Sequence, residues 1–310
     1  MCRPAGLDPS RSGPLVAAEV ESATPRSSHR PRTLALWPYA EAMPDRGRIR
    51  GVLYDIDGVL VTSWQEIAGA ADAVRRVGER GLRRAFLTNT TSRTCAEIAR
   101  RLCDSGIEVD AAEIVTAARL TAEFVRGRYP DAAVWVLNHG DIEADLTGLT
   151  LDADQPGVVV IGGAGPEFTH SALSRVVELM LEGVPVVAMH SGLTWATAEG
   201  LRVDAGVYLP GLEAAGNARI EVVGKPAASG FRTAAALMRL DPAQVMMIGD
   251  DLYSDVLAAQ DAGLTGVLVR TGKFRPGVLA SADRAPDHVI DSVAALPEFL
   301  ADPTERANPP

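Results

Sequence analysis

Aromatic side chains, cysteines and long apolar runs are all scarce in this sequence. Aromatic residues make up 5% of the 310 positions, so the apolar interior must come mainly from Ala, Val and Leu, which suits layered helices and sheets. The cysteines Cys2, Cys95 and Cys103 are odd in number and lack the spacing of metal ligands. They favour unpaired thiols in a reducing cytoplasm over a disulfide framework.

Surplus positive charge is also missing, because the formal net charge is -10. Nucleic acids and anionic membrane surfaces are bound mainly through surplus Lys and Arg. No apolar run approaches the roughly 20 residues needed to span a bilayer. We therefore expect no nucleic-acid partner and no membrane partner, and an anionic substrate would need local positive charge or a metal ion.

Residues 1–48 lack the continuous apolar core of a secretory signal and contain the stretch TPRSSHRPR. We expect a flexible N-terminal tail, with a start assigned too early, upstream of Met43, as the alternative. Residues 304–310 are expected to form a C-terminal tail.

Beyond residue 50, short β-rich runs alternate with Ala-rich helical patterns. This alternation predicts an α/β fold with a doubly wound parallel sheet covered by helices. The predicted core strands are 51–54, 84–87, 220–223, 245–248 and 266–269.

A second alternating set follows Pro130. Its predicted strands are 133–138, 157–162 and 185–189, around a helix at 171–181. We therefore expect an inserted α/β domain at 131–217, within a core formed by 49–130 and 218–303.

Each predicted core strand ends in a polar or glycine-containing cluster: DIDG, TNTT, GKP, GDD and RTGK. Doubly wound sheets bind ligands at the carboxyl ends of their strands. Asp55 and Asp57 lie at i and i+2 on an extended segment, so their carboxylates point the same way and repel unless a cation or a shared proton relieves them. The pair predicts an ion.

These clusters offer the parts that phosphoryl transfer requires. Asp55 offers a nucleophile, Asp57 a general acid and base, and Asp250 a third carboxylate for a metal. Oxygen ligands without nearby His or Cys favour Mg²⁺ over zinc.

The remaining clusters offer groups that bind an anion. Thr88 and Asn89 can supply a hydroxyl, an amide and main-chain N–H groups to the phosphoryl oxygens, and Lys225 a positive charge. Asp251 and Asp255 either orient metal-bound water or cap the helix that follows.

The motifs DIDGVL, LTNT, VGKP and GDDLYSD, in this order, resemble those of the haloacid dehalogenase-type phosphatases of subfamily IIA, which carry a C2-type cap between the second and third motifs. The resemblance covers residues 50–300. It implies that Asp55 attacks phosphorus to form an aspartyl-phosphate, and that Asp57 protonates the leaving group and then deprotonates water.

The resemblance also implies the binding groups. Asp55, the main-chain carbonyl of Asp57 and Asp250 would hold Mg²⁺. Thr88 and Asn89 would bind the phosphoryl group, braced by Lys225, with Asp255 outside the metal's direct ligands. A homodimer formed through the cap is a further implication.

The stretches EVVGKP, VMMIGDD and VRTGKFRP look most like the branch of phospholysine, phosphohistidine and inorganic pyrophosphate phosphatases and related hydrolase-domain proteins. Those phosphatases carry serine where this chain has Asp57, so ordinary phosphate monoesters with poor leaving groups are within its chemical reach. The cap stretch HSGLTWATAEG also departs from the branch. His190 and Trp195 there either line the site or are a surface histidine and a packed tryptophan.

We expect a Mg²⁺-dependent phosphatase acting on small phosphorylated molecules, with P–N or pyrophosphate substrates as the alternative. A phosphoacceptor signalling domain uses similar groups but is much shorter, and a catalytically idle interaction protein is the third possibility. The stretch VVIGGAGPEF does not have the G-x-G-x-x-G spacing of a dinucleotide site.

Overall fold

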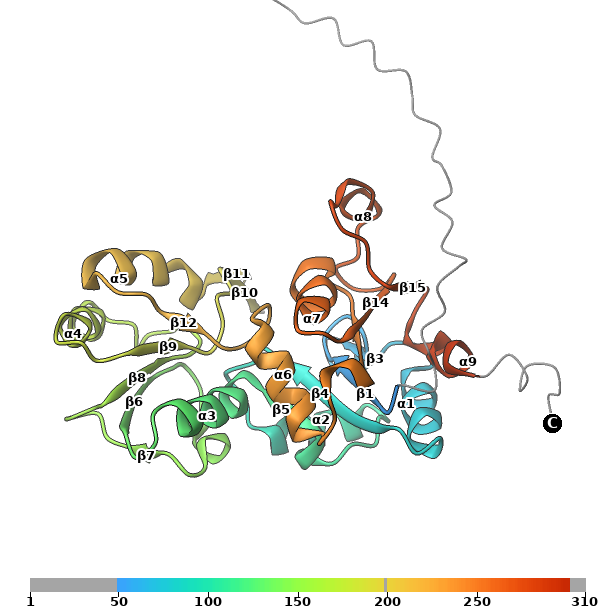
Figure 1. The fold of residues 1–310 in the computed structure, drawn as a ribbon, viewed down its shortest axis with the longest axis horizontal. Coiled ribbons are helices and arrows are strands. Elements are labelled where there is room, and N and C mark those ends of the chain that lie inside the picture. Colours follow the sequence, from blue (N-terminus) through green and yellow to red (C-terminus); the bar gives the residue numbers. More distant parts are fainter. Residues whose placement is uncertain (1–48, 198–199, 302–310) are drawn as a thin grey trace, which may run out of the picture. The chain divides into compact units, whose positions relative to one another are not determined.

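A computed structural model describes residues 49–197 and 200–301, without the side chains of 195–197. The predicted tails, 1–48 and 304–310, lie outside the described residues. The described part contains a six-stranded sheet in the order β15-β14-β13-β1-β4-β5, with every neighbouring pair parallel (Figure 1). Its strands are β1 (Gly51–Asp55), β4 (Arg83–Thr88), β5 (Ile114–Thr116), β13 (Val245–Gly249), β14 (Thr265–Val269) and β15 (His288–Ile290).

Side chains of this first sheet alternate between two apolar clusters, as the pleat requires. Val52 and Tyr54 join the cluster built with helices α1 (Ala70–Glu79) and α2 (Cys95–Asp104), whereas Leu53 joins the opposite cluster. All five residues of β1 are buried, because helices cover both faces of a parallel sheet.

A second sheet has the order β12-β9-β8-β6-β7, and its neighbouring strands are also parallel. Its strands are β6 (Ala133–Leu137), β7 (Thr150–Leu151), β8 (Val158–Ile161), β9 (Val186–Ala188) and β12 (Glu221–Val222). The predicted strands at 133–138, 157–162 and 185–189 are confirmed, and so is the predicted helix at 171–181, which is α4 (His170–Leu181).

The prediction that 220–223 belongs to the first sheet is wrong. Glu221 pairs with Val187 and Val222 pairs with Ala188, so this strand forms an edge of the second sheet. An apolar run can indicate a buried strand, but it does not specify which sheet accepts its hydrogen bonds.

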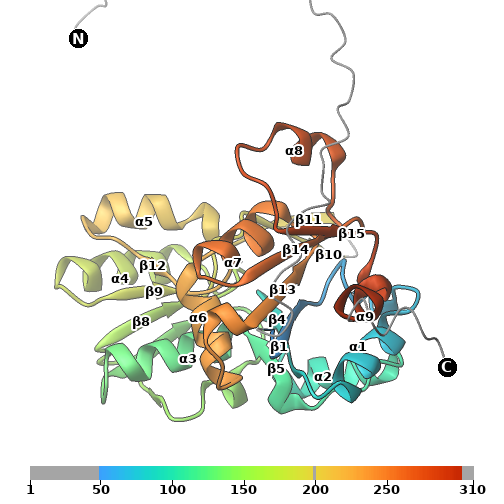
Figure 2. The same ribbon diagram turned by 45° about the vertical axis from the view of Figure 1, so that its right-hand side comes forward.

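Helices cover the second sheet on both faces (Figure 2). Helices α4 and α5 (Leu209–Gly216) pack on one face. Helices α3 (Ala117–Arg128) and α6 (Ala228–Leu237) contribute to an apolar cluster that also takes in Leu53 and Leu87 of the first sheet. This shared cluster joins the sheets within one compact unit, and the predicted division into core and inserted domain stays a prediction.

The remaining described strands and α-helices are short: β2 (Val61–Thr62), β3 (Gln65–Glu66), β10 (Thr194–Thr197), β11 (Gly200–Val203), α7 (Ala258–Asp261), α8 (Pro276–Ser281) and α9 (Leu296–Leu300). A π-helical turn, Leu252–Leu257, leads directly into α7. Among the described helices, none combines the length and apolar character required for a membrane crossing.

Candidate active site

The carboxyl ends of three neighbouring strands bring the predicted residues to one edge of the first sheet. Asp55 is the last residue of β1, Thr88 is the last residue of β4, and Asp250 directly follows β13. Because β13, β1 and β4 are adjacent and parallel, these groups converge although they are far apart in the sequence.

Lys225 reaches the same place from the second sheet. It follows β12 through Gly224, whose N–H donates to the carbonyl of Met189. The Lys225 Nζ lies 2.5 Å from Asp55 Oδ1 and 2.8 Å from Asp255 Oδ1. A single ammonium group therefore bridges two buried carboxylates.

Three carboxylates form a buried acidic cluster, made by Asp55, Asp250 and Asp255. One oxygen from each lies within 4.8 Å of the others, and the residues are 6%, 1% and 1% exposed. Asp250 Oδ1 is buried and has no hydrogen-bond partner among the described residues. Three carboxylates facing one ammonium leave negative charge unbalanced, so the donor set fits a hard divalent cation.

The electrostatics of the cluster follow from burial. Burial raises the pKa of Asp55 to about 7, with Lys225 opposing the rise and Asp255 adding to it. Burial likewise raises the pKa of Asp250 to about 6. Burial alone would lower the pKa of Lys225, but Asp255 and Asp55 raise it well above its ordinary value, so the ammonium stays charged.

Asp57 lies beside the acidic cluster and its carboxylate is not part of it. The residue is exposed to solvent, yet the surrounding protein raises its pKa by partly removing the carboxylate from water. The charges of Lys225, Lys273 and Arg93 oppose that rise. This is a carboxyl group at an accessible position, which suits proton exchange with a substrate or with water.

Two glycines make room for Asp250. A Cβ atom on Gly58 would lie 2.0 Å from Asp250 Oδ2, and a Cβ atom on Gly272 would lie 1.9 Å from the same oxygen. Both residues have positive φ, 87° and 56°. Thr271 Oγ1 donates to the Gly58 carbonyl at 2.5 Å, which ties the two loops together.

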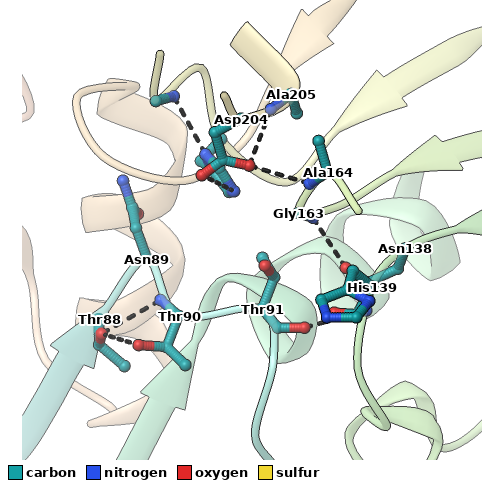
Figure 3. A network of polar contacts seen from close by, with 12 residues as sticks. Thr88, Asn89, Thr90, Thr91, Asn138, His139, Gly163, Ala164, Asp204 and Ala205 are labelled. Atoms are coloured by element: carbon teal, nitrogen blue, oxygen red, sulfur yellow. Dashed lines mark hydrogen bonds and ion pairs between the residues drawn. The ribbon is translucent and has the colours of Figure 1, made fainter. Parts of the chain in front are cut away.

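Thr88 and Asn89 stand at the end of β4 (Figure 3). The hydroxyl oxygen of Thr88 accepts from the Thr90 N–H at 3.2 Å. The Asn89 side chain is engaged at both ends: Nδ2 donates to the Lys225 carbonyl at 2.8 Å, and Oδ1 accepts from the Lys225 N–H at 3.0 Å. The side-chain amide of Asn89 therefore positions Lys225. The main-chain N–H of Asn89 is then the group of this residue that could donate a hydrogen bond to a phosphoryl oxygen.

Asp251 and Asp255 have different surroundings. Asp251 Oδ1 accepts from the N–H groups of Tyr253 and Ser254, so it caps the π-helical turn. Asp255 Oδ2 accepts from the Asp251 N–H, and its other oxygen faces Lys225. The Lys225–Asp255 pair has no signal in the sequence, because the two residues follow strands that belong to different sheets.

A polar network continues from the β4 loop into the second sheet (Figure 3). Asn138 Nδ2 donates to the Thr91 carbonyl at 3.0 Å, and Asn138 Oδ1 accepts from the Gly163 N–H at 2.8 Å. The glycines of VVIGGAGPEF thus serve close packing, since a Cβ on Gly163 would lie 2.4 Å from Thr91 Oγ1.

His190 is buried rather than at the surface, with 4% exposure. Its Nδ1 accepts from the Gly192 N–H at 3.0 Å, and its Nε2 lies 3.8 Å from Asp204 Oδ2. Burial lowers the pKa of His190 in spite of the opposing effect of Asp204. The side chain of Trp195 lies outside the described residues.

The sequence of this chain is similar to known hydrolase families and to a named phosphatase. The model of the family described as haloacid dehalogenase-like hydrolase matches residues 52–152, and the model described as HAD-hydrolase-like matches residues 222–296. The chain is 32% identical over 258 residues to the phospholysine phosphohistidine inorganic pyrophosphate phosphatase of Danio rerio, covering 81% of this chain and 94% of the relative.

Solved structures agree with the sequence comparison. The 4-nitrophenylphosphatase of Thermotoga maritima superposes with a TM-score of 0.75 at 25% identity, covering 83% of this chain and 99% of that structure. NagD from E. coli K-12 superposes with a TM-score of 0.73 at 27% identity, covering 79% of this chain and 97% of that structure.

Proposed function

Because the chain belongs to the haloacid dehalogenase-like hydrolase family, we propose that it is a phosphatase that hydrolyses phosphorylated small molecules through a covalent intermediate on Asp55. The observation that carries the proposal is the buried cluster of carboxylates bridged by Lys225, beside the accessible carboxyl group of Asp57.

In the first half of the reaction, a carboxylate oxygen of Asp55 forms a bond to phosphorus, and the bond from phosphorus to the leaving oxygen breaks. Asp57 transfers its proton to that oxygen, which leaves as an alcohol. The raised pKa of Asp57 supports this role, because at a given pH a larger fraction of the molecules carries a proton on this carboxyl group. Thr88, the main-chain N–H of Asn89 and Lys225 bind the phosphoryl oxygens.

In the second half, water attacks the phosphorus of the aspartyl-phosphate. Asp57, now ionised, accepts a proton from the water, and the bond between phosphorus and the Asp55 oxygen breaks. The products are inorganic phosphate and the original carboxylate. One general acid and base therefore serves both halves of the cycle.

Mg²⁺ is the proposed cofactor, held by Asp55, the main-chain carbonyl of Asp57 and Asp250. The buried, unpaired Asp250 Oδ1 supports this ligand set. The ion would neutralise negative charge where the phosphoryl group meets the carboxylates. Asp255 and Asp251 are proposed to act on the site indirectly, through Lys225 and the π-helical turn.

Replacement of the nucleophile tests the proposal. Asp55→Asn should abolish phosphate release while the protein keeps its fold, since the substitution removes the nucleophile with little change in volume. Phosphate release with Mg²⁺ is the activity readout and circular dichroism is the control for folding. Unaltered turnover in this variant would refute the assignment, and a single stoichiometric phosphorylation of the wild type would indicate a phosphoacceptor domain instead.

Asp57 is tested with leaving groups of different acidity. Asp57→Asn should lower kcat/KM more for alkyl phosphates than for p-nitrophenyl phosphate, because only poor leaving groups depend on proton donation. The difference should reach about 10²-fold for the poorest leaving groups. A uniform loss across the series would count against the acid role.

Phosphoramidates and inorganic pyrophosphate are the second class of substrate that we propose to test, since the Danio rerio relative is named for both. A panel of phosphate esters, phosphoramidates and pyrophosphate, assayed with Mg²⁺, ranks the two classes directly. A cytoplasmic location and a homodimer formed through 131–217 are part of the same proposal. Light scattering of the purified protein tests the dimer.

A further inference from the structure

Lys273 lies in the loop after β14, and the fold brings this loop against the acidic cluster. The Lys273 N–H donates to Asp250 Oδ2 at 2.7 Å. The neighbouring Gly272 packs directly on Gly58, because a Cβ atom on Gly272 would lie 2.7 Å from the Cα atom of Gly58. The base of the Lys273 side chain is therefore fixed at the edge of the site.

The three positive charges near Asp57 differ in how far other groups neutralise them. Lys225 is held by Asp55 and Asp255. Arg93 pairs with Glu97, with Nε and Oε1 3.1 Å apart. Lys273 is exposed, and within residues 49–197 and 200–301 no salt bridge joins its ammonium group to a carboxylate. Of these three cations, Lys273 is thus the one that remains available to a ligand.

The position of Lys273 favours the leaving-group side of the substrate. Its main chain is hydrogen-bonded to Asp250, and its charge acts on both Asp250 and Asp57, the proposed proton donor, which must face the leaving oxygen. A cavity of about 200 Å³ opens beside Asp250. Lys273 and Arg275 are the basic residues of its lining, and several of the other lining residues are apolar. This volume is below the roughly 300 Å³ at which ordinary small-molecule sites begin, so it suits a compact group.

We propose that Lys273 binds an anionic group on the leaving-group side of the substrate, so that this enzyme prefers compact phosphorylated compounds with a second negative charge. The second charge is a carboxylate or a second phosphoryl group. The inference rests on the proposed phosphatase function and names its substrate class. A charge-assisted hydrogen bond from an unpaired ammonium group supplies the preference.

Matched substrates test the inference at a fixed concentration of free Mg²⁺. Propyl phosphate has an uncharged leaving group, 2-carboxyethyl phosphate adds a carboxylate to a chain of the same length, and inorganic pyrophosphate supplies a phosphoryl group. Lys273→Gln should lower kcat/KM about tenfold or more for one or both anionic substrates, and less than about threefold for propyl phosphate, as expected for a lost charge-assisted hydrogen bond. Lys273→Arg should restore the preference in part.

Arg270→Gln is the matched control, because it removes the same charge from the same loop while Arg270 pairs with Asp291 at 2.7 Å, away from the cluster. Loss on the carboxylate substrate alone identifies a carboxylate, and loss on pyrophosphate alone identifies a phosphoryl group. Equal losses on all three substrates, no loss on either anionic one, or the same pattern in Arg270→Gln would overturn the inference. Absence of phosphate release by the wild type from all three substrates, with release from p-nitrophenyl phosphate, would overturn the inference alone. Absence of release from p-nitrophenyl phosphate and from the whole substrate panel would instead overturn the proposed function, and the inference with it.

Discussion

Lys225 and Asp250 contribute differently to the charge balance of the site. Lys225 balances part of the charge of Asp55 and Asp255, and its burial makes that contact strong. Asp250 receives one N–H, from Lys273, and keeps its other oxygen unpaired. The protein alone therefore leaves a site that a divalent cation would complete.

The raised pKa values predict how stability depends on pH without metal. The pKa of Asp55 is about 7 and that of Asp250 about 6, whereas both are near 3.8 in the unfolded chain. The unfolded chain releases these protons first as pH rises. The stability contributed by the two groups is therefore largest below about pH 4 and is lost as pH rises through about 6 to 7.

Mg²⁺ should reverse this loss, because it binds the ionised carboxylates. We expect Mg²⁺ to raise the Tm much more at pH 8 than at pH 5. At pH 8 and a hundredfold excess over its Kd, Mg²⁺ should add about 2.7 kcal/mol to the free energy of unfolding. Scanning fluorimetry measures the shift. Asp250→Asn is the control and should show a small shift at both pH values. A shift that is independent of pH, or unchanged in the variant, would contradict the metal assignment.

At the scale of elements, the site depends on loops that follow strands of two sheets. The β4 loop holds the β12–α6 loop through the paired hydrogen bonds between Asn89 and Lys225. The β14 loop closes over Asp250 through Gly272 and Lys273. The approach of the β14 loop to Asp250 requires a glycine at position 272, because a Cβ there would lie 1.9 Å from Asp250 Oδ2.

Gly272 tests the close approach. Gly272→Ala should strain the backbone and also push against Asp250, so we expect a loss of about 1 kcal/mol in stability together with a weaker Mg²⁺-induced Tm shift and lower kcat/KM. Gly81→Ala is the matched control, since Gly81 has a φ of 74° and no atom within 4 Å of the place that an added methyl group would occupy. Gly81→Ala should lower the stability of the protein but leave the Mg²⁺-induced Tm shift and kcat/KM unchanged. Equal effects on metal binding in both variants would show that backbone strain, and not contact with Asp250, is responsible.

At the scale of the whole molecule, every residue proposed for the site lies between positions 55 and 273, within the described part of the chain. The apolar cluster shared by the two sheets places these residues in one compact unit. The proposed catalytic groups therefore depend on the assembled sheets.

A chain that begins at Met43 should keep its activity. We expect kcat/KM within about twofold of the full chain, and a Tm within a few degrees, because no proposed group is removed. Phosphate release and scanning fluorimetry measure both. A loss of activity with an unchanged Tm would show that residues 1–42 contribute to the site.

The sequence alone determined the first sheet's central strands, the strand-end positions of Asp55, Thr88 and Asp250, and the resemblance to a phosphatase family. It could do so because burial, strand length and the polar residues that end each strand are local patterns. The wrong assignment of 220–223 shows the limit of such patterns, since hydrogen-bonding partners are chosen by the assembled sheet.

Only the tertiary structure decided that the Asn89 side chain hydrogen-bonds to the main chain of Lys225 and that Asp255 is the second partner of the Lys225 ammonium group. It also decided that Lys273 lies at the edge of the acidic cluster. These contacts join segments that are far apart in the chain. Their geometry depends on how two sheets pack around a shared apolar cluster, which no local pattern of residues encodes.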